Sequence, residues 1–430
     1  MKKILFMLIL IQGVLMSSVV DSIKIRGVDV PFIFESDENL PIVSMQFVFK
    51  NSGSLKDGEL EGLARLSAKI LNEGTKKLGS TGFAKKLENN AIDLGVSNGK
   101  ETFVITISCL KEKIDLALEL LKELLQDPNF SEDSLKKIKY LTMASISKNE
   151  TNYDYIAGKE LKKLIFAKTS MAKSSLGTKE SIAKIKMDDI TKFIKNNIVL
   201  KKALIVGGGD IKVEDIKSKS AKILNLLEVG KSSEVKFIGS GLKTPHENIT
   251  YKDEVQQAYI YFGTEFDLKY DDKDVYKATV ANFILGGSGF GSRLMEEIRV
   301  KHGLAYSVYC RISLAKSHSL FSGYLQTKLK SQDKAKKMVQ DLITDFVKNG
   351  ATKEELDSAK KFLLGSEPLR NETLGQRVGR SFNEYYKGFK LGHSKEVLKK
   401  IEKLTLKDLN SFITKHNEIK NLSFSIVTKK

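Results

Sequence analysis

The chain has 430 residues, 41% of them hydrophobic, which is enough for two or three domains with buried cores and excludes a disordered tail. Its net charge of +18 is compatible with an acidic partner, a membrane surface or nucleic acid, but no aromatic residues interleave with the lysine pairs, so we expect no nucleic-acid groove. The two cysteines, Cys109 and Cys310, are too few for a disulfide framework or a cysteine metal site, and we expect both to be buried thiols.

The N-terminus has the pattern of a secretory signal peptide, which we place at residues 1–20. Lys2 and Lys3 precede an apolar run of about 13 residues, shorter than the roughly 20 residues that span a bilayer. Small residues at Ser17 and Ser18 mark the cleavage region. We therefore expect a periplasmic protein that is not inserted in the membrane once the signal is removed; an uncleaved N-terminal anchor is the alternative.

The first half of the remaining chain alternates strand and helix patterns. Apolar and polar residues alternate over residues 41–54 and 101–110, as in half-buried strands. The segments 61–75, 114–139 and 184–197 have helical spacing, for example at Ile114, Leu118 and Leu121. The apolar run 203–209 then predicts a buried strand.

The second half follows residues 230–248, a stretch rich in Gly, Ser and Lys that we interpret as an interdomain linker. Strands are expected at 255–268, 318–327 and 422–428, and helices at 274–289, 335–361 and 403–416. These segments come in the same order as those of the first half.

The two halves are an internal repeat. When the two halves are aligned, similar residues recur at a nearly constant sequence offset. The aligned pairs include Ile185 with Leu404, Asp189 with Asp408, Phe193 with Phe412, Leu121 with Leu342 and Leu135 with Leu356. We therefore predict an α+β protein of two tandem homologous domains of about 200 residues, at 21–229 and 249–430. Duplicated domains leave a cleft between them where ligands bind.

Residues 55–95 and 285–309 resemble the pitrilysin/insulinase-like peptidases, whose smaller bacterial members look like the subunits of the mitochondrial processing peptidase. The second segment is the more specific, with a Gly-rich turn, SRL, an acidic helix face and then R-x-x-x-G-L-x-Y. The resemblance covers nearly the whole chain beyond the signal. It implies that each domain is a mainly antiparallel sheet packed by helices, and that the two domains form half of a clamshell.

Active members of that family carry an inverted zinc motif, H-x-x-E-H, on a helix of the first domain. Two histidines four residues apart share one helix face and one metal, and the glutamate activates the bound water. By alignment these positions hold Arg65, Ala68 and Lys69 here, and the third ligand, a glutamate in the family, is Ser145. The resemblance therefore implies that this chain binds no zinc.

The second domain keeps the family's other site. Arg299 and Tyr306 match an arginine and a tyrosine that lie opposite the zinc in active members, which implies roles in substrate binding and transition-state stabilisation. Gly286 and Gly287 could let the backbone approach a substrate or a partner closely. The structural alternative is that Arg299 caps its helix and that Tyr306 is an ordinary strand residue.

Together these features predict the non-zinc subunit of a heterodimeric metallopeptidase, inactive alone. A homologous partner subunit would carry H-x-x-E-H and the zinc, and the substrate would be a peptide or an unfolded polypeptide. The main alternative is a catalytically inert structural or binding homologue. A metal-independent enzyme is disfavoured because the sequence shows no arrangement of a nucleophile and a base.

Overall fold

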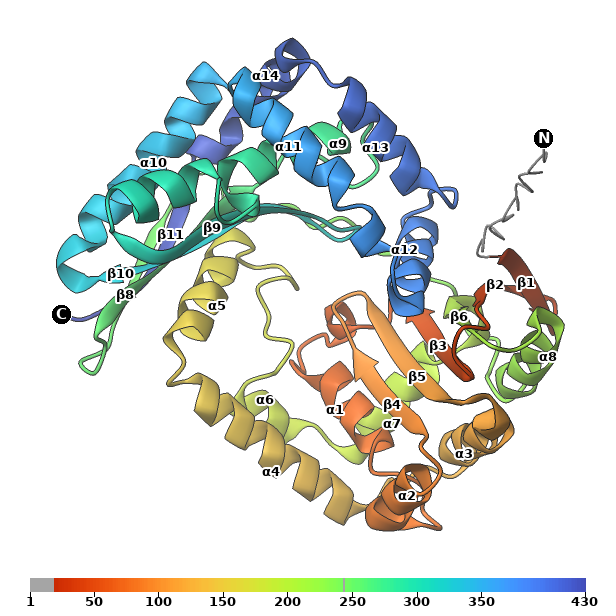
Figure 1. Cartoon of the computed structure of the whole chain (residues 1–430). Coiled ribbons are helices and arrows are strands. Elements are labelled where there is room, and N and C mark those ends of the chain that lie inside the picture. The colour runs from red at the N-terminus through yellow and green to blue at the C-terminus, as the bar shows by residue number, and fades with distance from the viewer. Residues whose placement is uncertain (1–18, 243) are drawn as a thin grey trace, which may run out of the picture.

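The computed structural model describes residues 19–242 and 244–430, which form two sheets packed by helices (Figure 1). The predicted α+β class is confirmed. The predicted signal peptide lies outside the described residues except for Val19 and Val20, which begin the first strand. Within the described part of the chain, no helix combines the length and the apolar character that crossing a bilayer requires.

The first sheet has six strands in the order β1-β2-β6-β3-β5-β4. Its strands are β1 (Val19–Ile25), β2 (Val28–Ser36), β3 (Ile42–Lys50), β4 (Asp93–Asn98), β5 (Thr102–Leu110) and β6 (Ala203–Gly209). β2 and β6 are parallel, whereas the other neighbours are antiparallel. The strand predicted at 203–209 is β6.

The second sheet repeats this arrangement without the edge strand β1. Its order is β7-β11-β8-β10-β9. The strands are β7 (Glu247–Tyr251), β8 (Gln257–Glu265), β9 (Ala305–Leu314), β10 (Ser319–Lys328) and β11 (Ser423–Thr428). β7 and β11 are the parallel pair, at the place that β2 and β6 take in the first sheet. The internal repeat is therefore one strand topology used twice.

Helices surround both sheets. The first half contains α1 (Leu63–Leu71), α2 (Gly79–Glu88), α3 (Ile114–Gln126), α4 (Glu132–Asn149), α5 (Tyr153–Ile165), α6 (Lys179–Lys184), α7 (Met187–Asn197) and α8 (Val213–Leu224). The second half contains α9 (Val275–Asn282), α10 (Gln332–Asn349), α11 (Lys353–Gly365), α12 (Leu374–Tyr386), α13 (His393–Lys403) and α14 (Leu406–Lys415). Where the sequence predicts one helix over 274–289, α9 ends at Asn282 and a π-helical turn, Phe283–Gly287, follows.

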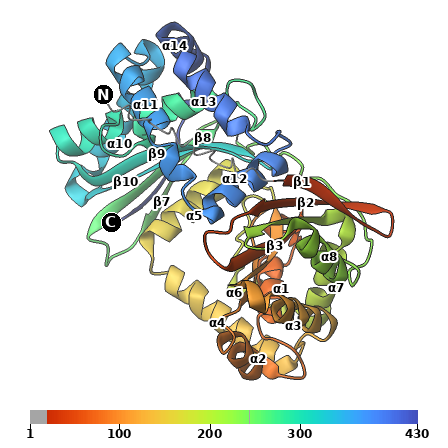
Figure 2. The same cartoon turned by 45° about the vertical axis from the view of Figure 1, so that its right-hand side comes forward.

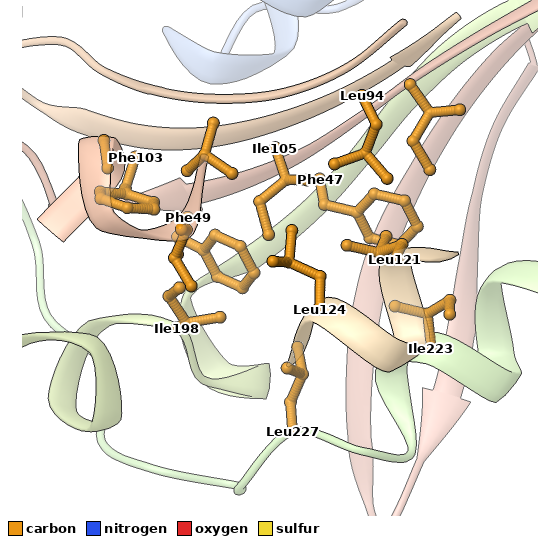
Figure 3. Packing of buried hydrophobic residues seen from close by; sticks show 14 of the residues in the cluster. Phe47, Phe49, Leu94, Phe103, Ile105, Leu121, Leu124, Ile198, Ile223 and Leu227 are labelled. Carbon is orange, nitrogen blue, oxygen red and sulfur yellow. The ribbon is translucent and has the colours of Figure 1, made fainter. Parts of the chain in front are cut away.

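The core of the first half lies between its sheet and its own helices. Residues of β5 alternate between buried and partly exposed, as a sheet with one buried face requires. Figure 3 shows Phe47 and Phe49 of β3 pointing from the sheet toward Leu121 and Leu124 of α3. The helical spacing seen in the sequence is thus the stripe that covers the sheet.

Two helices cross from one half to the other. α5 leaves the first half and packs on β8 and β11 of the second sheet, where Ala157 and Val427 are buried together. α12 of the second half packs on β2 and β6 of the first sheet, with Val378 and Phe382 against a cluster that contains Leu204. Both views show this exchange (Figures 1 and 2). Because α5 and α12 occupy matching places in the repeat, each half supplies a helix that covers the other half's sheet.

Polar contacts complete the seam between the halves. Arg377 of α12 forms ion pairs with Glu35, near the end of β2, and with Asp37, just after that strand. The hairpin turns of the two sheets also meet, because the backbone N–H of Ser317 donates to Glu101 at 2.8 Å. Tyr386 donates to the same carboxylate at 2.7 Å. These contacts join equivalent parts of the two repeats.

The connecting segment before β7 has little regular structure but is held in place. The backbone N–H of Ile238 donates to Ser317 O at 2.7 Å, and that of Gly241 donates to Ile165 O at 2.9 Å. Asn51 donates to Glu234 O at 2.6 Å. The segment therefore contacts both halves.

Candidate functional site

The helix that carries the zinc motif in active relatives is intact as a helix. α1 begins after Gly62, whose φ of 90° suits glycine, and Asp57 accepts hydrogen bonds from the backbone N–H groups of Gly62 (2.9 Å) and Ala64 (2.8 Å). Burial raises the pKa of Asp57 to about 7, while these two donors act in the opposite direction. The apolar side of α1, with Leu66 and Ile70, is buried in the core.

The motif positions on α1 carry cations in place of ligands. Arg65 and Lys69 are partly exposed and one turn apart, and Ala68 beside them is buried. Burial lowers the pKa of Lys69, and the positive charge of Arg65 lowers it further. Nε of Arg65 is buried without a hydrogen-bond partner. The two side chains are therefore close together, and both can only donate hydrogen bonds.

The fourth predicted position lies on the neighbouring helix. α4 packs on α1, and Ser145 of α4 donates to Leu141 O at 3.0 Å, within its own helix. Position 145 therefore carries a hydroxyl that is hydrogen-bonded within its own helix, in place of the carboxylate that would ligate a metal. In residues 19–242 and 244–430, no group of three or more His, Cys, Asp or Glu side chains is arranged to hold a metal ion. The donors present at α1 and α4 do not fit zinc.

Arg299 and Tyr306 are brought together by a π-helical turn and a strand. Arg299 belongs to the turn Met295–Lys301, and Tyr306 is the second residue of β9. Cζ of Arg299 lies 4.9 Å from the centroid of the Tyr306 ring. The Tyr306 side chain is 79% exposed. Tyr306 is thus open to solvent and Arg299 beside it is partly exposed, so both side chains can donate to a bound molecule.

A third residue, Phe290, completes this arrangement and is missing from the sequence prediction. Its ring centroid lies 4.7 Å from Cζ of Arg299, and its side chain is 68% exposed. Stacking on an aromatic face restrains a guanidinium while leaving its N–H groups free to donate. Phe290 lies between Gly289 and Gly291, whose φ values of 72° and 85° shape the loop. An aromatic residue alone between such glycines was the available signal.

Gly286 and Gly287 lie in the π-helical turn before that loop. A Cβ on Gly286 would lie 2.7 Å from Sγ of Cys310 in β9, and one on Gly287 would collide with Asn282. The close approach is thus made within the domain, and it sets the loop against β9. Cys109 and Cys310 are both buried thiols, as predicted, and burial raises the pKa of Cys109 to about 11.

Beyond Tyr306, tyrosines continue across the second sheet. The rings of Tyr309 (β9) and Tyr324 (β10) are 5.4 Å apart, and those of Tyr324 and Tyr261 (β8) are 5.0 Å apart. Burial raises the pKa of both Tyr261 and Tyr324, so their phenols remain protonated donors. Tyr324 is the cross-strand neighbour of both Tyr309 and Tyr261, and such neighbours contact each other. The pairing of β9 with β10 is irregular between Tyr306 and Tyr309, which is how two residues three apart are both exposed.

Comparison with known proteins agrees with this picture. The family model described as "Insulinase (Peptidase family M16)" matches residues 32–179, and that described as "Peptidase M16 inactive domain" matches residues 184–363. The "Non-peptidase homolog YmxG" of Helicobacter pylori is 44% identical over 433 residues, covering 100% of this chain and 99% of that protein.

More distant relatives share the same architecture. The "Mitochondrial-processing peptidase subunit beta" of Blastocladiella emersonii is 21% identical over 287 residues, 65% of this chain and 61% of that one. The crystal structure of a peptidase M16 inactive domain from Pseudomonas fluorescens superimposes with a TM-score of 0.88 at 26% identity, covering 96% of this chain and 98% of that chain. With a repeated α+β sheet, a zinc motif replaced by cations and a full-length relative at 44% identity, the chain belongs to the insulinase family, peptidase family M16.

Proposed function

We propose that this chain is the non-zinc subunit of a heterodimeric metallopeptidase. A homologous partner carries H-x-x-E-H and the zinc, and this chain supplies Arg299 and Tyr306 to the peptide bound there. The observation that carries the proposal is the exposed stack of Phe290, Arg299 and Tyr306, which coexists with cations at the zinc positions of α1. An inert scaffold gains nothing from holding an exposed guanidinium and phenol in one orientation.

Each residue has a distinct role in this proposal. Arg299 donates from its planar edge to carbonyl oxygens of the peptide backbone. Tyr306 donates its O–H to the oxyanion that forms when water attacks the scissile carbonyl. Phe290 positions the guanidinium and has no contact with the reacting atoms. The partner's zinc would polarise that carbonyl and activate the water.

The relatives' names support a division of labour. One is called a non-peptidase homologue and another a subunit of a processing peptidase. The substrate would be a peptide or an unfolded polypeptide, and the net charge of +18 favours an acidic substrate or partner. We place the complex in the periplasm, so cell fractionation should recover the chain there with an N-terminus within residues 17–22; recovery of the full-length chain in the cytoplasm would contradict this location.

The proposal is tested by mixing the purified chain with a zinc-bearing homologue from the same organism. Peptidase activity should appear that neither protein has alone, and the isolated chain should contain no stoichiometric zinc. Tyr306→Phe removes one donor to an oxyanion, so kcat should fall by about 10²–10³ while the complex still assembles. Arg299→Lys keeps the charge but loses the planar fork, so KM should rise as well.

The matched control is Tyr251→Phe. Tyr251 is an exposed tyrosine on β7, at the opposite edge of the same sheet from β9, so this variant should retain full activity. Full activity of both Tyr306→Phe and Arg299→Lys in the mixed complex would instead show that the chain is an inert structural homologue. Tight zinc in the isolated chain would contradict the assignment of α1.

A further inference from the structure

A second site is present where the two halves and the connecting segment meet. A pocket of about 550 Å³ lies there, a size typical of small-molecule sites. Its wall includes Lys50 and Lys201 from the first half, and Lys269, Tyr270, Lys316 and Tyr386 from the second. Arg299 and Tyr306 do not line it, so the pocket is separate from the peptidase site.

The pocket has an excess of positive charge. Four lysines line it, against two carboxylates, Glu234 and Asp271. Within residues 19–242 and 244–430, none of the four lysines forms an ion pair with a carboxylate, although ion pairs are frequent elsewhere on the surface. Burial lowers the pKa of Lys50, and the positive charge of Lys316 lowers it further, while Glu234 partly opposes this. Cations from both halves thus repel one another across the seam.

The walls of the pocket are held by specific contacts. Nζ of Lys316 lies 5.1 Å from the ring centroid of Tyr386 and 5.8 Å from that of Tyr270. The hydroxyl of Tyr386 is fixed by its hydrogen bond to Glu101. On the opposite wall, the side chain of Asn51 donates to Glu234 O at 2.6 Å. These contacts hold Lys316, Tyr386 and the segment at Glu234 in place around the pocket that the four lysines line.

We propose that this pocket binds a multivalent phosphate-type anion, which holds the two halves together. Ammonium groups act as point charges toward phosphate oxygens, and four of them around one cavity suit a ligand with several negative oxygens. Since two of the lysines come from each half, the anion removes repulsion between the halves when it binds. The pocket's volume favours a short phosphate chain over a nucleic-acid strand. This inference is independent of the proposed peptidase role.

Thermal unfolding of the full chain with tripolyphosphate tests the proposal. Against sodium chloride at equal ionic strength, tripolyphosphate at about 100 times its Kd should raise Tm by about 3 °C. In Lys50→Ala/Lys316→Ala the affinity, measured by calorimetry, should fall about a hundredfold, so that at the same concentration of tripolyphosphate the rise nearly disappears. The ligand-free Tm of this variant should be equal or higher, because two repelling charges are gone.

A charge-matched control separates the pocket from general electrostatics. Lys76→Ala/Lys77→Ala removes two exposed lysines of the first half and should keep both the Tm rise and the affinity. If the first variant does not fold, Lys201→Ala/Lys269→Ala removes two exposed pocket lysines and should lose the response in the same way. Equal affinities for tripolyphosphate and ATP would show that the pocket recognises the phosphate groups alone. A higher affinity for ATP would show that the adenine base also binds, packed on Tyr270. No Tm rise beyond that of sodium chloride, or equal loss in the control, would overturn the proposal.

Discussion

The helices that follow β3 and β8 occupy the same place in the two repeats but have diverged in opposite ways. After β3, α1 has its cap at Asp57 and its buried apolar side, while the motif positions carry Arg65, Ala68 and Lys69 in place of the family's zinc motif. After β8, α9 ends early, and a Gly-rich loop presents Phe290 to Arg299. The contrast shows that the residues that fold a helix and those that perform chemistry on it are separable. Replacing the residues of the zinc motif is therefore compatible with an intact α1 and its cap.

The two crossing helices also differ in the kind of contact that each makes with the sheet it covers. α12 contacts the first sheet through ion pairs and through a close approach at Gly208, whereas α5 packs on the second sheet through apolar and aromatic side chains such as Ala157, Val427 and Tyr261. We therefore expect the α12 contact to tolerate substitution less well than the α5 contact.

The largest effect should come from Arg377→Met. The side chains of Glu35 and Asp37 are only 4% and 9% exposed, so removing the guanidinium breaks two ion pairs with buried carboxylates at once. The free energy of unfolding should fall by about 3–5 kcal/mol in urea titrations. Arg380→Met is the control, because Arg380 pairs with a single, more exposed carboxylate, Glu367, within the second half. A similar loss of unfolding free energy in both variants would show that the ion pairs between the halves contribute no more to stability than an ion pair within one half.

The hairpin turns at the seam should give a pH dependence. Burial lowers the pKa of His318 to about 4, and the charges of Lys100, Lys162 and Arg311 lower it further, with Glu101 in opposition. The unfolded chain, with a histidine pKa near 6.5, takes up a proton between about pH 6.5 and 4 that the folded chain does not. The contribution of His318 to stability is therefore complete above pH 6.5 and falls by up to about 3 kcal/mol toward pH 4, while the raised pKa of Asp57 acts in the opposite direction over the same range.

Two variants test whether His318 is the source of this pH dependence of stability. His318→Gln should flatten the fall measured by urea unfolding across this pH range. His302→Gln, which changes an exposed histidine outside the seam, should leave it unchanged. An unaltered pH profile in His318→Gln would assign the titration to another group.

The smallest expected effects come from glycine-to-alanine substitutions at the contacts of the two crossing helices. A Cβ on Gly208 would lie 2.7 Å from Cδ1 of Leu374 and 2.8 Å from the backbone O of Glu35, so Gly208→Ala should cost about 1–3 kcal/mol. In Gly158→Ala the new Cβ lies 3.2 Å from Cε1 of Tyr261, and the helical gain of about 1 kcal/mol offsets that strain. Thermal unfolding should show a lower Tm for the first and little change for the second. The reverse order would refute the asymmetry.

Much of the fold follows from local pattern. The alternation in β5 and the helical spacing from Ile114 to Leu121 depend only on which face is buried, so the sequence predicts them. Which sheet a helix covers depends on tertiary contacts, and for this reason the exchange of α5 and α12 was not predicted. At the site, the resemblance to the family pairs Arg299 with Tyr306, which the spacing of the two residues alone does not. The position of Phe290 between Gly289 and Gly291 indicates an exposed loop, but its contact with Arg299 depends on the conformation of that loop, which the residue pattern does not specify.

The exchange of α5 and α12 has a consequence for how the chain is made. While the ribosome is still adding the second half, the nascent first half has no α12, and the apolar face around Leu204 remains open to water. Neither half can be completed before nearly the whole chain has been synthesised, so a truncated first half should aggregate. If the protein is exported as we propose, the absence of α12 until late in synthesis keeps the polypeptide from folding completely, so that it can pass through a translocation channel unfolded.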